Sequence, residues 1–100
     1  MTVSLGEFFI QSASVTFTTG VEYTFNITNL GSSEHQFVIE PAGSQNTPIE
    51  TDAGAADVAT IAPGESVTLT VTFTDTGNFQ LASHTATDYE QGMALDIAVV

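Results

Sequence analysis

The side chains that could do chemistry in this 100-residue chain are few, and the most suggestive pair is Ser83-His84. A serine beside a histidine, with aspartates elsewhere, suggests the nucleophile and base of a hydrolase. Neighbouring residues on a strand, however, point to opposite faces, and the sequence contains no Gly-x-Ser-x-Gly elbow. The carboxylates Glu50 and Asp52 fall in a polar stretch without an aromatic pocket, and no glycine-rich phosphate loop is present. We therefore expect that the protein is not an enzyme.

Metal binding is the other chemistry that these residue types permit. The chain has no cysteine, so it offers neither a thiolate ligand nor a disulfide, and its only histidines are His35 and His84. His35 lies on the apolar face of a predicted strand and, by itself, is either a hydrogen-bonded core histidine or a ligand. His84 is expected on the opposite face from Ser83, toward solvent or the outer side of the sheet. Met93, by itself, is typical of a core-filling residue.

Strands with a period of two must position these residues. Apolar and polar side chains alternate in five segments, which gives the inward sets Val21, Tyr23, Phe25 and Ile27; His35, Phe37 and Ile39; Val67, Leu69, Val71 and Phe73; Phe79, Leu81 and Ser83; and Leu95, Ile97 and Val99. Residues 2–10 are predicted to form an opening strand with an irregularity near Gly6. Residues 43–57 are predicted to form a loop. Because turn residues separate short strands and no helical period occurs, we predict one all-β domain over residues 1–100.

A family resemblance is carried by residues in the order Glu34-His35, Gly77-x-Phe79, Ser83-His84 and Tyr89-Glu90-x-Gly92-Met93. The last part resembles the ligand loop of the cupredoxins, the family of small blue-copper β-sandwiches that includes plastocyanin and azurin. In the most similar subgroup, this loop reads Cys-His, three residues, then His-Tyr-Glu-x-Gly-Met. The resemblance covers nearly the whole chain, and it implies a Greek-key β-sandwich of seven or eight strands.

The resemblance implies that His35, Ser83, Asp88 and Met93 occupy the ancestral copper-site positions. Ser83 stands where the pattern has the copper-binding cysteine, and Asp88 stands where it has the second histidine. A blue-copper site needs two imidazoles, a thiolate and a long axial thioether, and a serine hydroxyl does not supply a thiolate. We therefore expect a non-catalytic scaffold without a cofactor, although copper is the ancestral one. The alternative is a copper-binding or electron-transfer protein with an altered ligand set of His35, Asp88 and Met93.

The charge balance of the chain bears on its origin and its partners. It has twelve Asp and Glu residues but no Lys or Arg, which gives a formal net charge of −12. An average composition would supply on the order of 12 basic residues, so we interpret the chain as an engineered variant lacking Lys and Arg. Without a basic patch, we expect neither nucleic acid nor an anionic membrane as a partner; no specific partner follows, and we expect a monomer.

The sequence gives few indications of cellular location. No apolar run approaches the roughly 20 residues needed to span a bilayer, and the N-terminus lacks a basic and then apolar signal segment. The family resemblance, by contrast, implies a periplasmic or extracytoplasmic origin.

Overall fold

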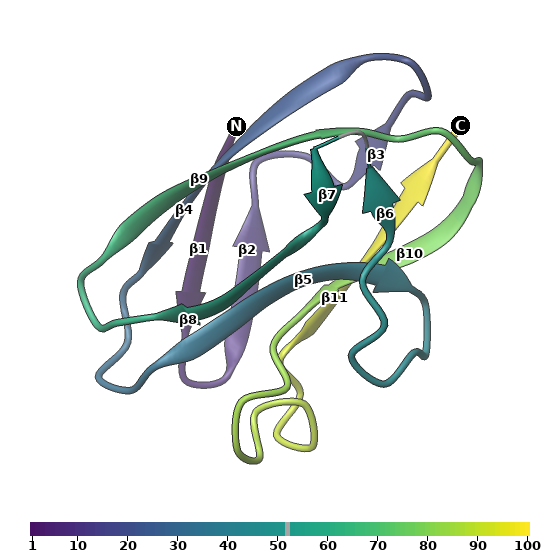
Figure 1. Ribbon diagram of the computed structural model, residues 1–100. Coiled ribbons are helices and arrows are strands. Elements are labelled where there is room, and N and C mark those ends of the chain that lie inside the picture. Colours follow the sequence, from purple (N-terminus) through teal and green to yellow (C-terminus); the bar gives the residue numbers. More distant parts are fainter. Residues whose placement is uncertain (52) are drawn as a thin grey trace.

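Two β-sheets pack face to face in the computed structural model, which describes residues 1–51 and 53–100 (Figure 1). The first sheet contains, in spatial order, β2 (Phe9–Ser12), β1 (Thr2–Gly6), β4 (Glu22–Asn29) and β9 (Ser66–Thr72). The second contains β3 (Thr16–Phe17), β11 (Ala94–Val99), β10 (Gly77–Ala82), β5 (His35–Pro41) and β8 (Asp57–Ile61). A two-stranded hairpin of β6 (Glu50–Thr51) and β7 (Gly54–Ala55) completes the elements of the described residues. The predicted all-β sandwich is confirmed.

The inward sets of the alternating strands form the core between the sheets. Phe25 of the first sheet and Phe37 of the second are fully buried, and their ring centroids lie 5.9 Å apart. The ring of Phe17 lies 5.6 Å from that of Phe25 and 5.4 Å from that of Phe73, so aromatic contacts continue across the interior. Such tilted pairs add to the hydrophobic effect of burying the rings. Val21 departs from its inward set, because 45% of its surface is exposed just before β4 begins.

The opening segment differs from the prediction. Residues 2–10 do not form one strand: β1 turns back at Glu7 and Phe8 and pairs antiparallel with β2, and β1 also pairs in parallel with β4. Gly6 makes this reversal possible, since a Cβ at that position would collide with the ring of Phe9. The extra strand brings the two sheets to nine strands in the described residues, where seven or eight were predicted.

The predicted loop over residues 43–57 also contains more structure than expected. It includes the hairpin of β6 and β7 and the first residue of β8, which pairs antiparallel with β5. The alternation in β8 is too weak to detect from sequence, because its only large apolar residues are Val58 and Ile61. Asp52, which the sequence places near Glu50, lies outside the described residues.

The sheet order determines which end of the sandwich carries the candidate site. β10 lies between β5 and β11, and residues 83–93 connect the end of β10 to the start of β11. This connection protrudes from the sandwich at the end opposite both termini (Figure 1). His35 begins β5 at the same end, since Val38 pairs with Ala82 at the close of β10.

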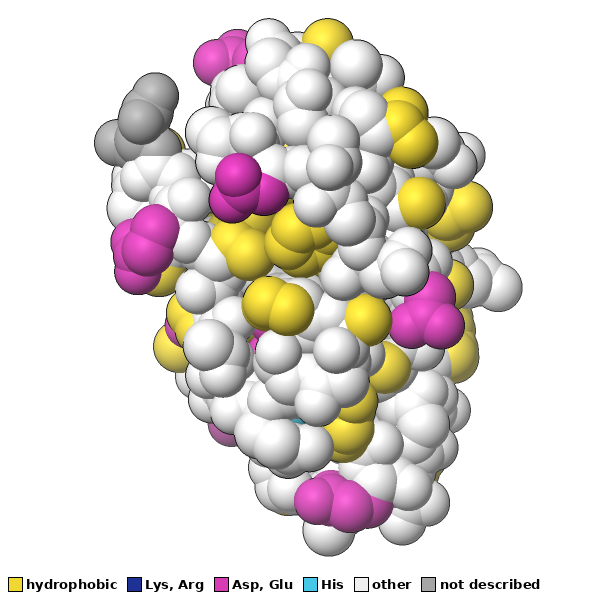
Figure 2. All heavy atoms as spheres, turned by 90° about the vertical axis from the view of Figure 1, so that its right-hand side faces the viewer, with side chains coloured by type: hydrophobic (Ala, Val, Ile, Leu, Met, Phe, Trp, Pro, Cys, Tyr) yellow, Lys and Arg dark blue, Asp and Glu magenta, His cyan; other side chains and the backbone are white. Residues whose placement is uncertain are grey.

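Two surface properties complete the description of the fold. On the face shown in Figure 2, acidic side chains are scattered and no basic side chain is present, as the composition requires. Across residues 1–51 and 53–100, no helix is long and apolar enough to cross a membrane.

Candidate functional site

The four residues that the sequence singles out lie at the loop end of the sandwich. His35 opens β5, Ser83 directly follows β10, Met93 directly precedes β11, and Asp88 lies in the turn-rich connection between them. The backbone N–H of Met93 donates to the carbonyl of Asp88 at 3.0 Å, and that of Ser83 donates to the carbonyl of Met93 at 3.2 Å. These bonds close the connection on itself. All four residues are buried, and Met93 belongs to the hydrophobic core, as its residue type indicates.

A hydrogen-bonded cluster joins His35, Ser83 and Asp88. The Oδ2 atom of Asp88 lies 2.7 Å from Nδ1 of His35 and 2.8 Å from Oγ of Ser83. Because a carboxylate oxygen only accepts, His35 donates through Nδ1–H and Ser83 donates through its hydroxyl. The Ser83 oxygen in turn accepts the backbone N–H of Gln36 at 2.9 Å. The polar groups facing one another in this buried region therefore satisfy each other, as buried polar groups must if they are to stabilise a fold.

The far nitrogen of His35 has a different environment. Its Nε2 is buried and is the one side-chain polar atom of the described residues that is both buried and without a hydrogen-bond partner. The nearest acidic group is Glu7, whose Oε1 lies 3.7 Å away, beyond hydrogen-bond distance. His35 is therefore held between two carboxylates, tightly by Asp88 and loosely by Glu7.

Glu7 is fixed by the loop that follows β4. Its Oε1 accepts the backbone N–H groups of Ser32 and Ser33, each at 2.8 Å. Desolvation raises the pKa of Glu7, but these hydrogen bonds together lower it by more, so the net shift of the pKa is downward. A Cβ on Gly31 would meet the Glu7 carboxylate, so the glycine leaves the space that this group occupies.

The arrangement does not fit nucleophilic catalysis. A catalytic serine must hydrogen-bond to its base, with the carboxylate on the far side of the imidazole. Here Ser83 and His35 both bond to the same oxygen of Asp88, so no base contacts the serine hydroxyl. Ser83 is also fully buried and out of reach of a substrate. The geometry agrees with the expectation from sequence that Ser83 is not a nucleophile.

The donor set does not fit a blue-copper ion either. The sequence supplies no thiolate, and the Nδ1 of His35 is committed to a short hydrogen bond with Asp88. Within the described part of the chain, no group of three or more His, Cys, Asp or Glu side chains is placed to hold a metal. Oxygen donors from Asp88 and Ser83 would favour harder cations than the Cu(I) state of a redox centre.

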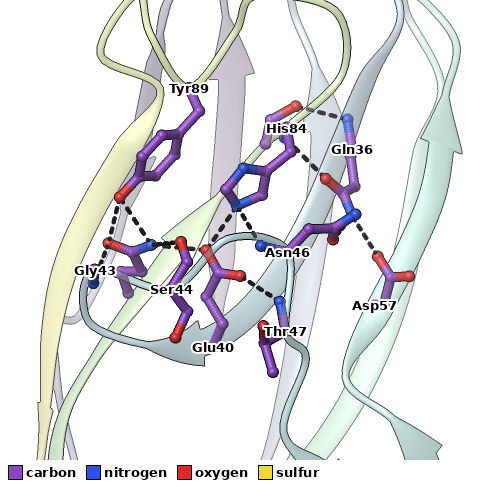
Figure 3. Close-up of polar contacts among 11 residues, drawn as sticks. Gln36, Glu40, Gly43, Ser44, Asn46, Thr47, Asp57, His84 and Tyr89 are labelled. Carbon is purple, nitrogen blue, oxygen red and sulfur yellow. Dashed lines mark hydrogen bonds and ion pairs between the residues drawn. The ribbon is translucent and has the colours of Figure 1, made fainter.

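A second polar cluster, on the outer side of the same sheet, was not predicted from the sequence (Figure 3). Glu40 is completely buried there, with Oε2 2.7 Å from Nε2 of His84. The side-chain amide of Gln80 donates to the same oxygen at 2.7 Å, and the backbone N–H of Thr47 donates to Oε1 at 2.9 Å. Tyr89 stacks on His84 with ring centroids 4.5 Å apart. His84 thus faces away from Ser83's partners, as predicted, and packs on the outer side of the sheet.

The sequence contained a partial signal for this second cluster. Gln36, Val38 and Glu40 alternate with the inward residues of β5, which places them on the opposite, outer face of the strand. The structure buries all three, because the connection after β5 covers that face: Thr47 and Asn46 of this connection bond to Glu40 and Gln36. A loop that covers a strand in this way leaves no periodic pattern in the sequence of the strand.

The two sheets form a sandwich, and its last two strands, β10 and β11, are joined by a loop that lies against the start of β5. Together with the similar solved structures, this arrangement shows that the chain has a cupredoxin-like fold. No protein-family model and no curated protein matches the sequence. Among solved structures, it is similar to a dithionite-reduced auracyanin from Roseiflexus castenholzii, with a TM-score of 0.74, 21% identity, and coverage of 99% of this chain and 94% of that one. It is also similar to auracyanin A, described as a "blue" copper protein, from Chloroflexus aurantiacus, with a TM-score of 0.74, 16% identity, and coverage of 100% and 98%.

Larger proteins contain the same fold as a part. A multicopper oxidase matches all of this chain, with a TM-score of 0.71 and 16% identity, but the match covers only 43% of that chain. At identities of this size, the similarity establishes the fold.

Proposed function

We propose that this chain is a non-catalytic, metal-free scaffold in which His35, Ser83, Asp88 and Met93 occupy the ancestral copper-ligand positions of a cupredoxin. At these positions, a hydrogen-bonded cluster takes the structural place of the metal. The observation that carries this proposal is the 2.7 Å contact between Nδ1 of His35 and Oδ2 of Asp88.

The physical argument concerns what a metal would have to displace. Nδ1 of His35 donates its proton to Asp88, and that carboxylate also accepts the hydrogen bond of the Ser83 hydroxyl. A metal bound there would remove the shared proton and break both hydrogen bonds inside the protein. Without a thiolate to form a strong bond, little would offset that loss.

The composition and the fold support further parts of the proposal. The absence of Lys and Arg in a chain of ordinary acidic content supports an engineered or selected origin. The fold it shares with auracyanins supports an extracytoplasmic ancestry. We further propose that the domain is a monomer without a nucleic-acid or membrane partner, because twelve carboxylates without basic residues repel phosphates and like-charged copies.

A copper titration of the chelator-treated protein tests the scaffold proposal. We expect the treated protein to keep its β circular dichroism and a cooperative thermal melt, and added Cu(II) to leave the melting temperature unchanged within about 1 °C. Loss of the fold on chelation would contradict the proposal. So would saturable Cu(II) binding whose paramagnetic-resonance signal disappears in His35→Gln.

One observation favours a second candidate, a metal-binding protein with the altered set His35, Asp88 and Met93. Nδ1 of His35 and Oδ2 of Asp88, on two of the three residues of this set, already lie 2.7 Å apart at the loop end of the sandwich. If this candidate is right, Zn(II) or Cu(II) at micromolar concentration should raise the melting temperature by several degrees. The rise should vanish in Asp88→Ala and persist in His84→Gln, which removes the histidine outside the set.

A further inference from the structure

A hollow of about 290 Å³ opens at the start of β10, whereas the His35 cluster lies beyond the other end of that strand. It forms where the turn between β9 and β10 meets the hairpin of β6 and β7. It is lined by three apolar residues, two threonines and two acidic residues: Ile49, Phe73 and Phe79, Thr72 and Thr74, and Glu50 and Asp75. Its volume is close to the lower end of the range for small-molecule pockets, roughly 300–1,000 Å³.

The hollow combines an apolar floor with an acidic rim. Phe73 is buried, and the ring of Phe79 lies 6.1 Å from it at a tilt of 48°. Glu50 and Asp75 are exposed, and within residues 1–51 and 53–100 neither carboxylate takes part in a side-chain hydrogen bond or an ion pair. On the face shown in Figure 2, apolar side chains gather beside acidic ones.

This combination selects for one kind of ligand. The two exposed carboxylates repel anions and attract cations, and the partly exposed ring of Phe79 adds a further attraction for a cation. A bare metal ion is disfavoured, since besides the two carboxylates the lining side chains offer only the hydroxyls of Thr72 and Thr74, too few oxygens to replace its water. The chain has no Lys or Arg of its own to fill the rim. The complementary occupant is a cation with a hydrocarbon body.

We propose that this hollow binds a small organic ammonium ion, with the hydrocarbon stem against Ile49, Phe73 and Phe79 and the ammonium group between Glu50 and Asp75. The site is separate from the ancestral copper positions, and it does not depend on the function proposed for them.

The probe that tests this proposal is 2-phenylethylammonium chloride, titrated into isotopically labelled protein at a constant ionic strength of about 100 mM to limit long-range attraction. We expect saturable shifts of the amide signals of residues 49–50 and 73–79, with a dissociation constant of roughly 1 mM or below. The neutral analogue 2-phenylethanol should bind at least about 5-fold more weakly, because it lacks the charge. Equal affinity for the two probes, or shifts that do not saturate, would overturn the proposal.

Matched variants distinguish binding at this hollow from a general attraction of the cation by the net charge of the protein. Glu50→Gln and Asp75→Asn should each weaken 2-phenylethylammonium binding by roughly 3- to 10-fold. Glu90→Gln makes the same change of net charge on an exposed loop residue beyond the other end of β10, and it should leave the dissociation constant unchanged within about 2-fold. All three positions are exposed, so the variants should melt like the parent. If Glu90→Gln weakened binding as much as the other two, the ligand would be held by net charge alone and the proposal would be wrong.

Discussion

Nδ1 of His35 donates a hydrogen bond to Oδ2 of Asp88 across 2.7 Å, in a region where both side chains are almost fully buried. The two residues are 53 positions apart in the sequence, so this bond ties the start of β5 to the loop before β11. It also commits Nδ1 of His35 to an acceptor within the protein, whereas the buried Nε2 has no hydrogen-bond partner among the described residues.

Removing Asp88 tests the structural value of this cluster. Asp88→Ala leaves the Nδ1–H of His35 and the hydroxyl of Ser83 buried without their acceptor, so we expect the free energy of unfolding to fall by about 2–4 kcal/mol. Urea denaturation monitored by circular dichroism measures this change. Glu90→Ala, on the exposed side of the same loop, should change it by less than about 0.5 kcal/mol. A similar loss in both variants would mean that the loop, and not the buried cluster, carries the effect.

The outer cluster makes an independent prediction. Glu40→Ala removes the acceptor shared by His84, Gln80 and Thr47, so we expect a loss of about 2–4 kcal/mol in unfolding free energy. Hydrogen exchange at the Thr47 amide should accelerate well beyond the change in global stability, because that amide loses its partner. The control is Glu22→Ala, which makes the same substitution at an exposed position. Unchanged exchange at Thr47 would show that Glu40 does not anchor the connection after β5.

The contribution of Glu7 to the stability of the fold should depend on pH, and the direction of this dependence follows from its lowered pKa. Its pKa is lower in the folded protein than in the unfolded chain, so its contribution to stability is present above the unfolded pKa of about 4.3 and is lost as pH falls through the lower folded value. Glu7→Gln should therefore lower the melting temperature at about pH 6, and this difference should shrink as the pH falls below the unfolded pKa. Thermal melts across this range test the sign. A difference that grows toward acid pH would contradict it. Gly31→Ala, which displaces the Glu7 carboxylate, should behave like Glu7→Gln.

The acidic excess predicts a response to salt. Twelve Asp and Glu without Lys or Arg repel one another, and screening relieves that repulsion. The melting temperature should rise by several degrees between about 10 mM and several hundred mM NaCl. Acidification to about pH 5 should not destabilise the fold as it would a protein whose carboxylates are paired with Lys or Arg, since this chain has neither. Melting that is independent of salt would show that the charges are too dispersed to matter.

The fold could be predicted from this sequence wherever one face of a strand is apolar. Phe25, Ile27 and Val71 alternate with polar residues and are buried as expected. The hairpin of β1 and β2 was missed, because β-propensity continues through the turn at Glu7 and Phe8 and only the packing of Phe9 against Gly6 reveals the reversal. β8 was missed because pairing with β5, more than its own side chains, makes it a strand.

The candidate site was predictable in its location but not in its bonding. Spacing and family resemblance selected His35, Ser83, Asp88 and Met93, and the structure brings the first three into one hydrogen-bonded cluster. The orientation of the imidazole ring determines which nitrogen of His35 faces Asp88. The turn between β1 and β2 determines that Glu7 approaches the other nitrogen. Alternation in β5 places Glu40 on the face opposite His35, but nothing in that pattern reports the connection that covers it.

The double variant Ser83→Cys/Asp88→His tests the central claim most directly. If these four residues occupy copper-ligand positions, the variant gains the thiolate and the second imidazole, which complete a set with His35 and Met93. Addition of Cu(II) should then produce an intense visible thiolate-to-copper absorption and a reversible redox couple, neither of which the parent protein should show. A folded double variant that binds Cu(II) weakly and without colour would contradict the assignment of these residues to the copper-ligand positions.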